Sequence, residues 1–206
     1  MQISYGRHNQ TIDIVATSEP PSAHALAQFN KVLAFSDYVG PLYLRRSRYV
    51  SNALATSKPV YQPTPYGPVL SRYDFYVIYN PDFMRDMAFR SGNDFATAAI
   101  FAHEIGHHFC GHVINGSWNA LKHPWAKECE AEYHSGRILA RLGAQPKDLQ
   151  LCQRLLFSWW GSPTHPDSIQ RIGAVVKGWK DAGGVGVAED DLQSIYQQFM
   201  YEQNCW

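Results

Sequence analysis

The segment FATAAIFAHEIGHHFCGH, residues 95–112, constrains the fold of this chain more than any other. Its first eight residues are mainly apolar and small, so a helix formed here belongs in the protein interior. His103 and His107 lie four residues apart, which places both imidazoles on one face of that helix. Buried imidazoles need polar partners, and one metal ion can satisfy both. The sequence therefore predicts a buried helix that presents two histidines to a metal ion; the alternative is a helix with solvated histidines.

The pattern H-E-x-x-H also contains Glu104, which is placed to act as a general base on a water molecule at the metal. A catalytic zinc usually takes three protein ligands, so a further ligand is needed. A third histidine on the same helix would stand at position 113 after a glycine at 110, but the chain has Val113 and Cys110 there. The third ligand must therefore come from elsewhere in the sequence.

Residues 126–143, AKECEAEYHSGRILARLG, supply suitable carboxylates. Glu128 and Glu132 lie four apart on one face of a predicted helix, and Glu130 points away from them. Three acids in five residues usually form a solvated face, but small residues such as Gly136 allow this helix to pack closely. We expect Glu128 to be the third ligand and Glu132 to accept a hydrogen bond from a ligand histidine.

Nine histidines make a chance match to a histidine motif a real risk, so the pattern alone does not settle function. His108 and His112 follow the motif, and their spacing turns them away from the face of His103 and His107. We interpret them as supporting or surface groups.

Three blocks of the sequence resemble gluzincin metallopeptidases of the HtpX-like and CAAX-prenyl-protease-like family, in its soluble branch. AHEIGHHFCGH resembles the zinc helix of that family, and ECEAEYHSGRILARLGA resembles its E-x-x-A-D glutamate helix. SPTHPDSIQRIGAVVKGW resembles its T-H-P-x-x-x-x-R-I block, and YVIYNPDFM resembles the strand before the zinc helix. The resemblance covers residues 71–180 and keeps the order of the blocks.

This resemblance implies a zinc-dependent endopeptidase that acts on peptides or unfolded proteins. The Zn²⁺ ligands would be His103, His107 and Glu128, with Glu104 as general base. The chain departs from the family at Glu132, which replaces the usual aspartate. We expect its longer side chain still to orient a ligand histidine.

The T-H-P block adds two further candidates. We expect His165 to face the site and to donate a hydrogen bond to the developing oxyanion; without the flanking match it would be a capping or loop histidine before Pro166. We expect Arg171 to be a structural or supporting partner of a carboxylate. This mechanism needs no covalent intermediate, so the cysteines are not nucleophiles.

The four cysteines form no C-x-x-C pair, which argues against a cysteine-based zinc site. We interpret them as buried thiols, with one or two disulfides in an exported protein as the alternative. A terminal thiolate plugging the metal is a further, less favoured interpretation of the last of them. The cysteines are Cys110, Cys129, Cys152 and Cys205.

The predicted fold class is α+β: a mostly helical, zincin-like metallopeptidase domain with a small sheet before the active-site helix. We expect a single domain over 1–206, with an N-terminal subregion (1–70), a catalytic core (71–180) and a C-terminal helix (181–206). The proline-rich residues 57–68 predict a loop or extended segment. A strand is expected over 71–83 and a turn at its end. The expected helices are one capped by Ser18, then 94–110, 125–142, 146–159, 166–180 and 189–203.

Charge and hydropathy exclude several other functions. Eighteen basic residues balance eighteen acidic ones, so no nucleic-acid partner is expected. No apolar run approaches the roughly 20 residues that span a bilayer. If the chain is complete we favour the cytoplasm; if a signal peptide has been removed, the periplasm or the exterior. The oligomeric state stays open.

Two alternatives to the peptidase remain. One is a catalytically inactive relative that works as a binding or chaperone-like module, although such a chain would be free to lose Glu104. The other is a zinc hydrolase that acts on something other than a peptide. The alternating strand 73–79 is either a sheet edge that binds substrate or an ordinary core strand.

Overall fold

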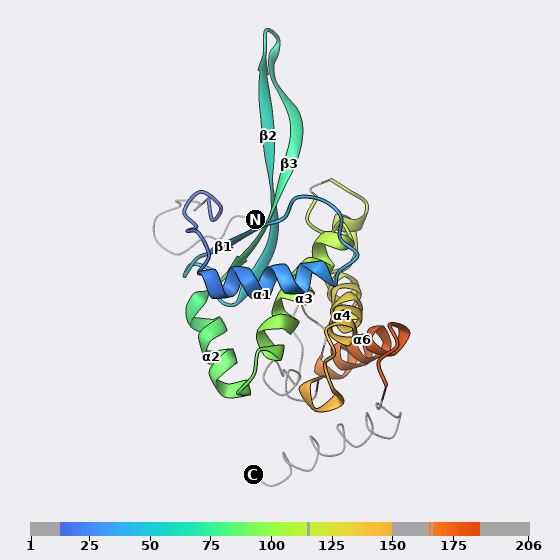
Figure 1. Ribbon diagram of the computed structural model, residues 1–206. Coiled ribbons are helices and arrows are strands. Elements are labelled where there is room, and N and C mark those ends of the chain that lie inside the picture. Colours follow the sequence, from blue (N-terminus) through green and yellow to red (C-terminus); the bar gives the residue numbers. More distant parts are fainter. Residues whose placement is uncertain (1–12, 115, 150–164, 166, 186–206) are drawn as a thin grey trace.

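The computed structural model describes residues 13–114, 116–149, 165 and 167–185. Within these ranges the chain forms a small three-stranded sheet with helices packed beside and beneath it (Figure 1). The predicted α+β class is confirmed at this level. None of the described helices combines the length and the hydropathy needed to cross a membrane.

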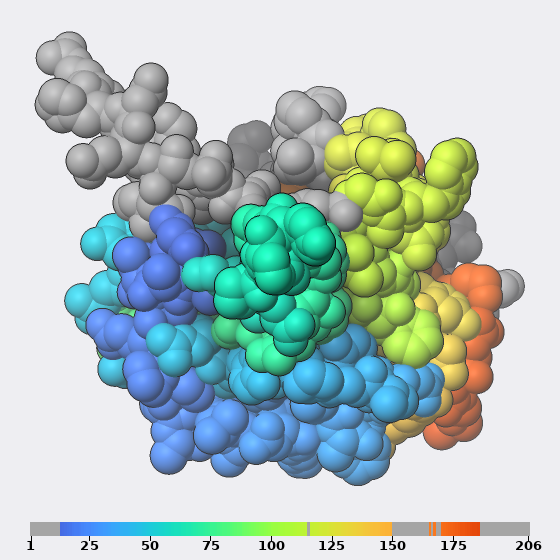
Figure 2. All heavy atoms as spheres, turned by 90° about the horizontal axis from the view of Figure 1, so that it is seen from above, coloured from blue at the N-terminus to red at the C-terminus, as the bar shows by residue number. Residues whose placement is uncertain are grey.

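The sheet has the strand order β1-β3-β2, and β3 is its central strand. Strand β1 (Tyr43–Arg46) runs parallel to the end of β3 (Gly67–Tyr79), and β2 (Ala53–Thr64) runs antiparallel to β3. The outer half of the β2–β3 hairpin projects far from the body of the protein (Figure 1). Seen down its length in Figure 2, the hairpin stands between the blue N-terminal segments and the yellow-green residues that follow α3.

The hairpin decides between alternatives that the sequence left open at two places. Residues 57–68 form most of β2, the hairpin turn and the start of β3, so they are the extended segment rather than the loop. Proline is tolerated here because β2 is an edge strand. Residues 76–79 lie between β1 and β2, so this part of β3 is not the free edge to which a substrate could add. Strand β2 pairs with β3 on both sides of residue 70, so the expected end of the N-terminal subregion falls within the hairpin.

The first two helices differ from expectation at their starts. Helix α1 (Ala23–Ala34) is capped by Ser22, whose hydroxyl accepts from the Ala25 amide at 3.2 Å, and not by Ser18. Helix α2 (Pro81–Ser91) replaces the turn predicted at the end of the strand. Asn80 caps α2, Pro81 occupies its first turn and Gly92 ends it at φ 66°, which together are strong helix signals that the turn interpretation overlooked.

The helices that carry the motifs lie close to their predicted positions. They are α3 (Phe95–Phe109), α4 (Pro124–Arg141) and α6 (Ser168–Asp181), and a short 3₁₀ helix, η1 (Asn119–Leu121), precedes α4. The helix expected over 146–159 lies mostly outside the described residues, and the one expected over 189–203 lies wholly outside them.

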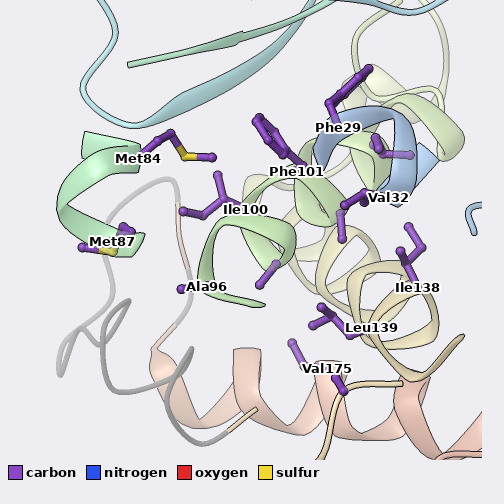
Figure 3. Packing of buried hydrophobic residues seen from close by; sticks show 14 of the residues in the cluster. Phe29, Val32, Met84, Met87, Ala96, Ile100, Phe101, Ile138, Leu139 and Val175 are labelled. Atoms are coloured by element: carbon purple, nitrogen blue, oxygen red, sulfur yellow. The ribbon is translucent and has the colours of Figure 1, made fainter. Parts of the chain in front are cut away.

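Helix α3 runs through the centre of the hydrophobic core. Figure 3 shows Ile100 and Phe101 of α3 surrounded by apolar side chains of α1, α2, α4 and α6. The Phe101 ring meets the edges of Phe29 at 5.5 Å and Tyr79 at 5.9 Å between centroids, so it ties α3 to both α1 and the sheet. The predicted burial of this helix is therefore observed.

Glycines let three helices pack closely. A Cβ at Gly106 of α3 would lie 2.7 Å from the Ala131 carbonyl oxygen of α4. A Cβ at Gly136 of α4 would lie 1.9 Å from the Val175 carbonyl oxygen of α6. Helix α4 is thus held against α3 on one side and α6 on the other, which brings its carboxylates to the histidines of α3.

Candidate metal centre

Two histidines of α3 and one glutamate of α4 converge on a common point. The Nε2 atoms of His103 and His107 lie 3.1 Å apart. The Glu128 carboxylate oxygens lie 3.3 Å from His103 Nε2 and 3.4 Å from His107 Nε2. We call these three residues the first cluster; they are the three ligands that the sequence predicts.

These separations suit one small divalent cation. Zinc binds nitrogen and oxygen ligands at about 2.0–2.1 Å, so two ligands at the corners of a tetrahedron are about 3.3–3.4 Å apart. The Nε2–Nε2 separation of 3.1 Å is close to that value, and so are the distances of 3.3 Å from His103 Nε2 to Glu128 Oε2 and of 3.4 Å from His107 Nε2 to Glu128 Oε1. The donor set of two imidazoles and one carboxylate is also one that zinc accepts.

The first cluster is incompletely satisfied by protein groups. Glu128 is 9% exposed, and no described residue hydrogen-bonds its buried Oε2. Two imidazole nitrogens can face each other at 3.1 Å only if one carries a proton or if both bind a cation, because two lone pairs repel. Buried polar atoms are nearly always paired, so the Oε2 atom of Glu128 is available to bind a cation together with the two rings.

The electrostatics of the first cluster also favour a cation. Burial alone would lower the pKa of His103, but the charges of Glu132 and Glu128 outweigh it and raise that pKa to about 10. Burial likewise opposes ionisation of Glu128, yet the imidazoles of His103 and His107 hold its pKa far below the usual range. The surroundings therefore stabilise a positive charge between these three side chains.

Glu132 and Arg171 lie directly behind His103. One Glu132 oxygen is 3.5 Å from His103 Nδ1, and Arg171 Nε donates to that oxygen at 2.8 Å. Burial would raise the pKa of Glu132, but His103 and Arg171 lower it to about 2. The structure thus brings together Glu132 and Arg171, the two residues to which the sequence assigns a supporting role. The Glu132 carboxylate is ionised and faces the His103 ring.

The two candidate catalytic residues are related to the first cluster in different ways, Glu104 by sequence and His165 by a contact. Glu104 follows His103 on α3 and is 8% exposed. His165 lies in the segment before α6, and its Nε2 is 3.5 Å from Glu128 Oε2. About half of the His165 side chain is exposed, so it borders both the Glu128 carboxylate and solvent.

A second group of potential ligands lies at the C-terminal end of α3. Cys110, His112 and Glu130 offer ligand atoms within 4.8 Å of one another, and we call them the second cluster. His112 Nε2 is 2.8 Å from Glu130 Oε2, and Lys122 Nζ lies 2.6 and 2.9 Å from the two Glu130 oxygens. Sequence reasoning noted no such group.

The second cluster corrects the interpretation of His112. This ring does not point away from the ligand histidines, because its Nδ1 lies 3.0 Å from His107 Nδ1. Burial lowers the pKa of His112 to about 4, so the ring is neutral near pH 7. Gly111 was the available signal, because a glycine directly after a helix commonly turns the chain back over its last turn.

His108 supports the site from the opposite side. It is 6% exposed and its Nε2 donates to the Tyr76 carbonyl of β3 at 2.9 Å. Burial lowers the pKa of His108 to about 4. The neutral ring therefore anchors α3 to the sheet.

Two of the four cysteines lie within the described residues. Cys110 and Cys129 are free and half-buried. Burial and the nearby Glu130 raise the pKa of Cys110 to about 11, so its thiol is protonated near pH 7. Cys152 and Cys205 lie outside the described residues.

Comparison with family profiles, with curated proteins and with solved structures finds no match to this chain. The geometry of the two clusters therefore carries the functional argument.

Proposed function

We propose that this protein is a zinc-dependent endopeptidase with a zincin-like domain. His103, His107 and Glu128 would hold the ion. The observation that carries the proposal is the close approach of the two Nε2 atoms, 3.1 Å apart, and the Glu128 carboxylate, one oxygen of which lies 3.3 Å from His103 Nε2 and the other 3.4 Å from His107 Nε2. These values are near the ligand separations of a tetrahedral zinc site.

Zinc held by two imidazoles and a carboxylate supplies a Lewis acid that polarises a peptide carbonyl and activates water near neutral pH. Glu104, next to the ligand His103 on α3, is the general base. Its carboxylate accepts the proton of the attacking water and later passes it to the leaving amine. This role uses a carboxylate that is buried on α3 next to His103 in the sequence and is not itself one of the ligands.

His165 is the candidate electrophilic residue. Its Nε2 lies 3.5 Å from Glu128, so the ring borders the site on the side of the third ligand. A neutral or protonated imidazole there can donate a hydrogen bond to the oxyanion that forms during attack. Its exposure suits a residue that must meet a substrate arriving from solvent.

The substrate class, a peptide or an unfolded protein, rests on the resemblance of the three sequence blocks to gluzincin peptidases. The motifs keep Glu104, the residue that a non-catalytic binding module would not need. A peptidase is for this reason favoured over an inactive relative.

The test is zinc-dependent cleavage of an unfolded protein such as casein by the purified chain. We expect a chelator to abolish cleavage and added zinc to restore it. Glu104→Gln should reduce kcat/KM by roughly 100- to 10,000-fold, because general-base catalysis contributes about that much. Zinc content should stay at the wild-type level, since Glu104 is not a ligand.

Two outcomes contradict the proposal. Undiminished cleavage by the Glu104→Gln protein would show that the general base is misassigned. A zinc-loaded chain that cleaves no peptide would favour the binding-module alternative.

A further inference from the structure

The end of α3 turns the chain back on itself and places His112 beside His107. Gly111 has φ 70°, in the left-handed region. The His112 amide donates to the His107 carbonyl, and the Gly111 amide donates to the His108 carbonyl, both at 3.0 Å. This is the Schellman arrangement, in which the residue after the glycine lies over the last helical turn. Here it brings two imidazoles into contact instead of two apolar side chains.

A continuous series of polar contacts leads from His107 to a lysine. His107 Nδ1 lies 3.0 Å from His112 Nδ1, and His112 Nε2 lies 2.8 Å from Glu130 Oε2. Lys122 donates to both oxygens of Glu130. The His112 side chain is 2% exposed, whereas Glu130 and Lys122 are about one-third exposed, so the series runs from the interior towards the surface.

Only one assignment of protons satisfies these contacts when His107 Nε2 binds a cation. Nε2 must then present its lone pair, so Nδ1 carries the proton and donates it to His112 Nδ1. His112 accepts at Nδ1, so its own proton sits on Nε2 and is donated to Glu130. Glu130 is the acceptor, and Lys122 holds it by donating to both of its oxygens.

We propose that His112 and Glu130 are positioning residues that fix the tautomer and ring orientation of His107, so that its Nε2 faces the metal. The inference rests on the proposed metal site and assigns the second cluster to the support of a ligand rather than to a second ion. Partners of this kind typically change metal affinity by 10- to 100-fold.

The two ligand histidines are then supported in parallel ways. His103 Nδ1 faces Glu132, which Arg171 holds. His107 Nδ1 reaches its carboxylate through one additional ring, and a lysine holds that carboxylate. Each imidazole is backed by an ionised glutamate that a cationic side chain stabilises.

The test compares the zinc dissociation constants of three full-length proteins by competition with a chelator. His112→Phe keeps a ring of similar shape but removes both nitrogen atoms, and we expect it to weaken zinc binding 10- to 100-fold. His112→Asn keeps an acceptor near the position of Nδ1, and we expect binding within about threefold of wild type. His134→Phe makes the same change at a half-buried ring outside the series, so zinc binding should not change.

A second measurement reports the hydrogen bond itself. In the zinc-loaded wild type, the His107 Nδ1 proton should appear in the imidazole region of an NMR spectrum as a slowly exchanging signal. His112→Asn should retain this signal, and His112→Phe should lose it. If His112 acted only by packing, its substitution would change thermal stability, but the NMR signal would not be retained in one variant and lost in the other.

Zinc binding that is equally tight in wild type and in a folded His112→Phe protein overturns the positioning role. The positioning role is also overturned if the wild type binds two zinc ions and the His112→Phe protein loses only one of them, because His112 would then be a ligand of a second ion. If wild type binds no zinc, the metal site itself is wrong and this inference falls with it. Because the readout is affinity, zinc binding without peptide cleavage would contradict the proposed activity and leave the positioning role to be judged by the same variants.

Discussion

The first and second clusters contain similar side chains but differ in how those side chains are satisfied. Each combines imidazole with a glutamate of α4, and each brings its potential ligand atoms within 4.8 Å. In the second cluster, Lys122 already holds Glu130, and both nitrogens of His112 have partners. In the first cluster, Glu128 Oε2 lacks a hydrogen bond among the described residues.

The difference shows that ligand types and short distances do not by themselves define a metal site. Glu128 and Glu130 are two residues apart on α4. Glu128 meets the ring nitrogens of His103 and His107, whereas Glu130 meets the ammonium group of Lys122 as well as one ring nitrogen. A cation at the second cluster would have to displace Lys122 and remove the proton of Cys110, whose pKa is raised to about 11 by burial and by Glu130. A cation at the first cluster displaces no ammonium group, although it must displace the proton of His103, whose pKa is about 10 because the charges of Glu132 and Glu128 outweigh burial.

The largest expected effect comes from exchanging the two glutamates for glutamine in turn. Glu128→Gln should weaken zinc binding by more than 100-fold, because it removes a ligand rather than a supporting partner. Glu130→Gln keeps an oxygen that can accept from His112, and we expect about a tenfold loss. Isothermal titration with zinc measures both. An equal loss in the two variants would erase the distinction between the clusters.

A smaller effect is expected at the contact between α3 and α4 that sets the first cluster. Gly106→Ala would place a methyl group 2.7 Å from the Ala131 carbonyl oxygen, so the helices must separate. We expect a loss of about 1–3 kcal/mol in the free energy of unfolding, as for other overpacked sites, together with weaker zinc binding.

Gly173→Ala is the matched control for this change. Gly173 lies within α6, and a Cβ there would meet no atom of the described residues within 4 Å. Replacing it should stabilise the protein by about 0.5–1 kcal/mol through helix propensity, with unchanged zinc affinity. Urea denaturation measures both variants. A Gly106→Ala protein as stable as wild type would mean that the helices are not in the close contact described.

The smallest effect concerns the stability of the metal-free protein at different pH values. The pKa of His103 rises from 6.5 to about 10 on folding, so its contribution is full below pH 6.5 and is lost as the pH rises towards 10. The pKa of His112 falls from 6.5 to about 4, so its contribution is present above pH 6.5 and is lost as the pH falls towards 4. The two clusters therefore respond in opposite directions.

Denaturation at pH 5, 7 and 9 in the presence of a chelator tests this contrast. Relative to wild type, His103→Asn should flatten the decline in stability between pH 7 and 9. His112→Asn should flatten the decline between pH 7 and 5. Each difference should be on the order of 1 kcal/mol, because one pKa unit corresponds to about 1.4 kcal/mol. If both variants changed the free energy of unfolding in the same pH range, the opposite pKa shifts of His103 and His112 would be contradicted.

The sequence was sufficient to predict the first cluster because helix geometry determines it. A four-residue spacing puts His103 and His107 on one face of α3 and Glu128 and Glu132 on one face of α4. Only the packing of these two helix faces against each other depends on tertiary structure, and small residues such as Gly106 allow the helices to approach closely.

The second cluster could not be predicted in the same way. Helical periodicity fails at Gly111, where the left-handed backbone reverses the chain and carries His112 back to His107. The hairpin was missed for a similar reason, since prolines argue against a strand unless that strand lies at the edge of its sheet. Helix α2 was missed although Asn80 and Gly92 mark both of its ends.

The most direct test of the first cluster is the zinc X-ray absorption spectrum of the full-length protein loaded with one equivalent of the metal. Our account predicts nitrogen and oxygen ligands at about 2.0–2.1 Å, with the scattering pattern of two imidazoles, and a spectrum that changes in Glu128→Gln but not in Cys110→Ser. A sulfur ligand at about 2.3 Å that disappears in Cys110→Ser would place the ion in the second cluster and contradict the account.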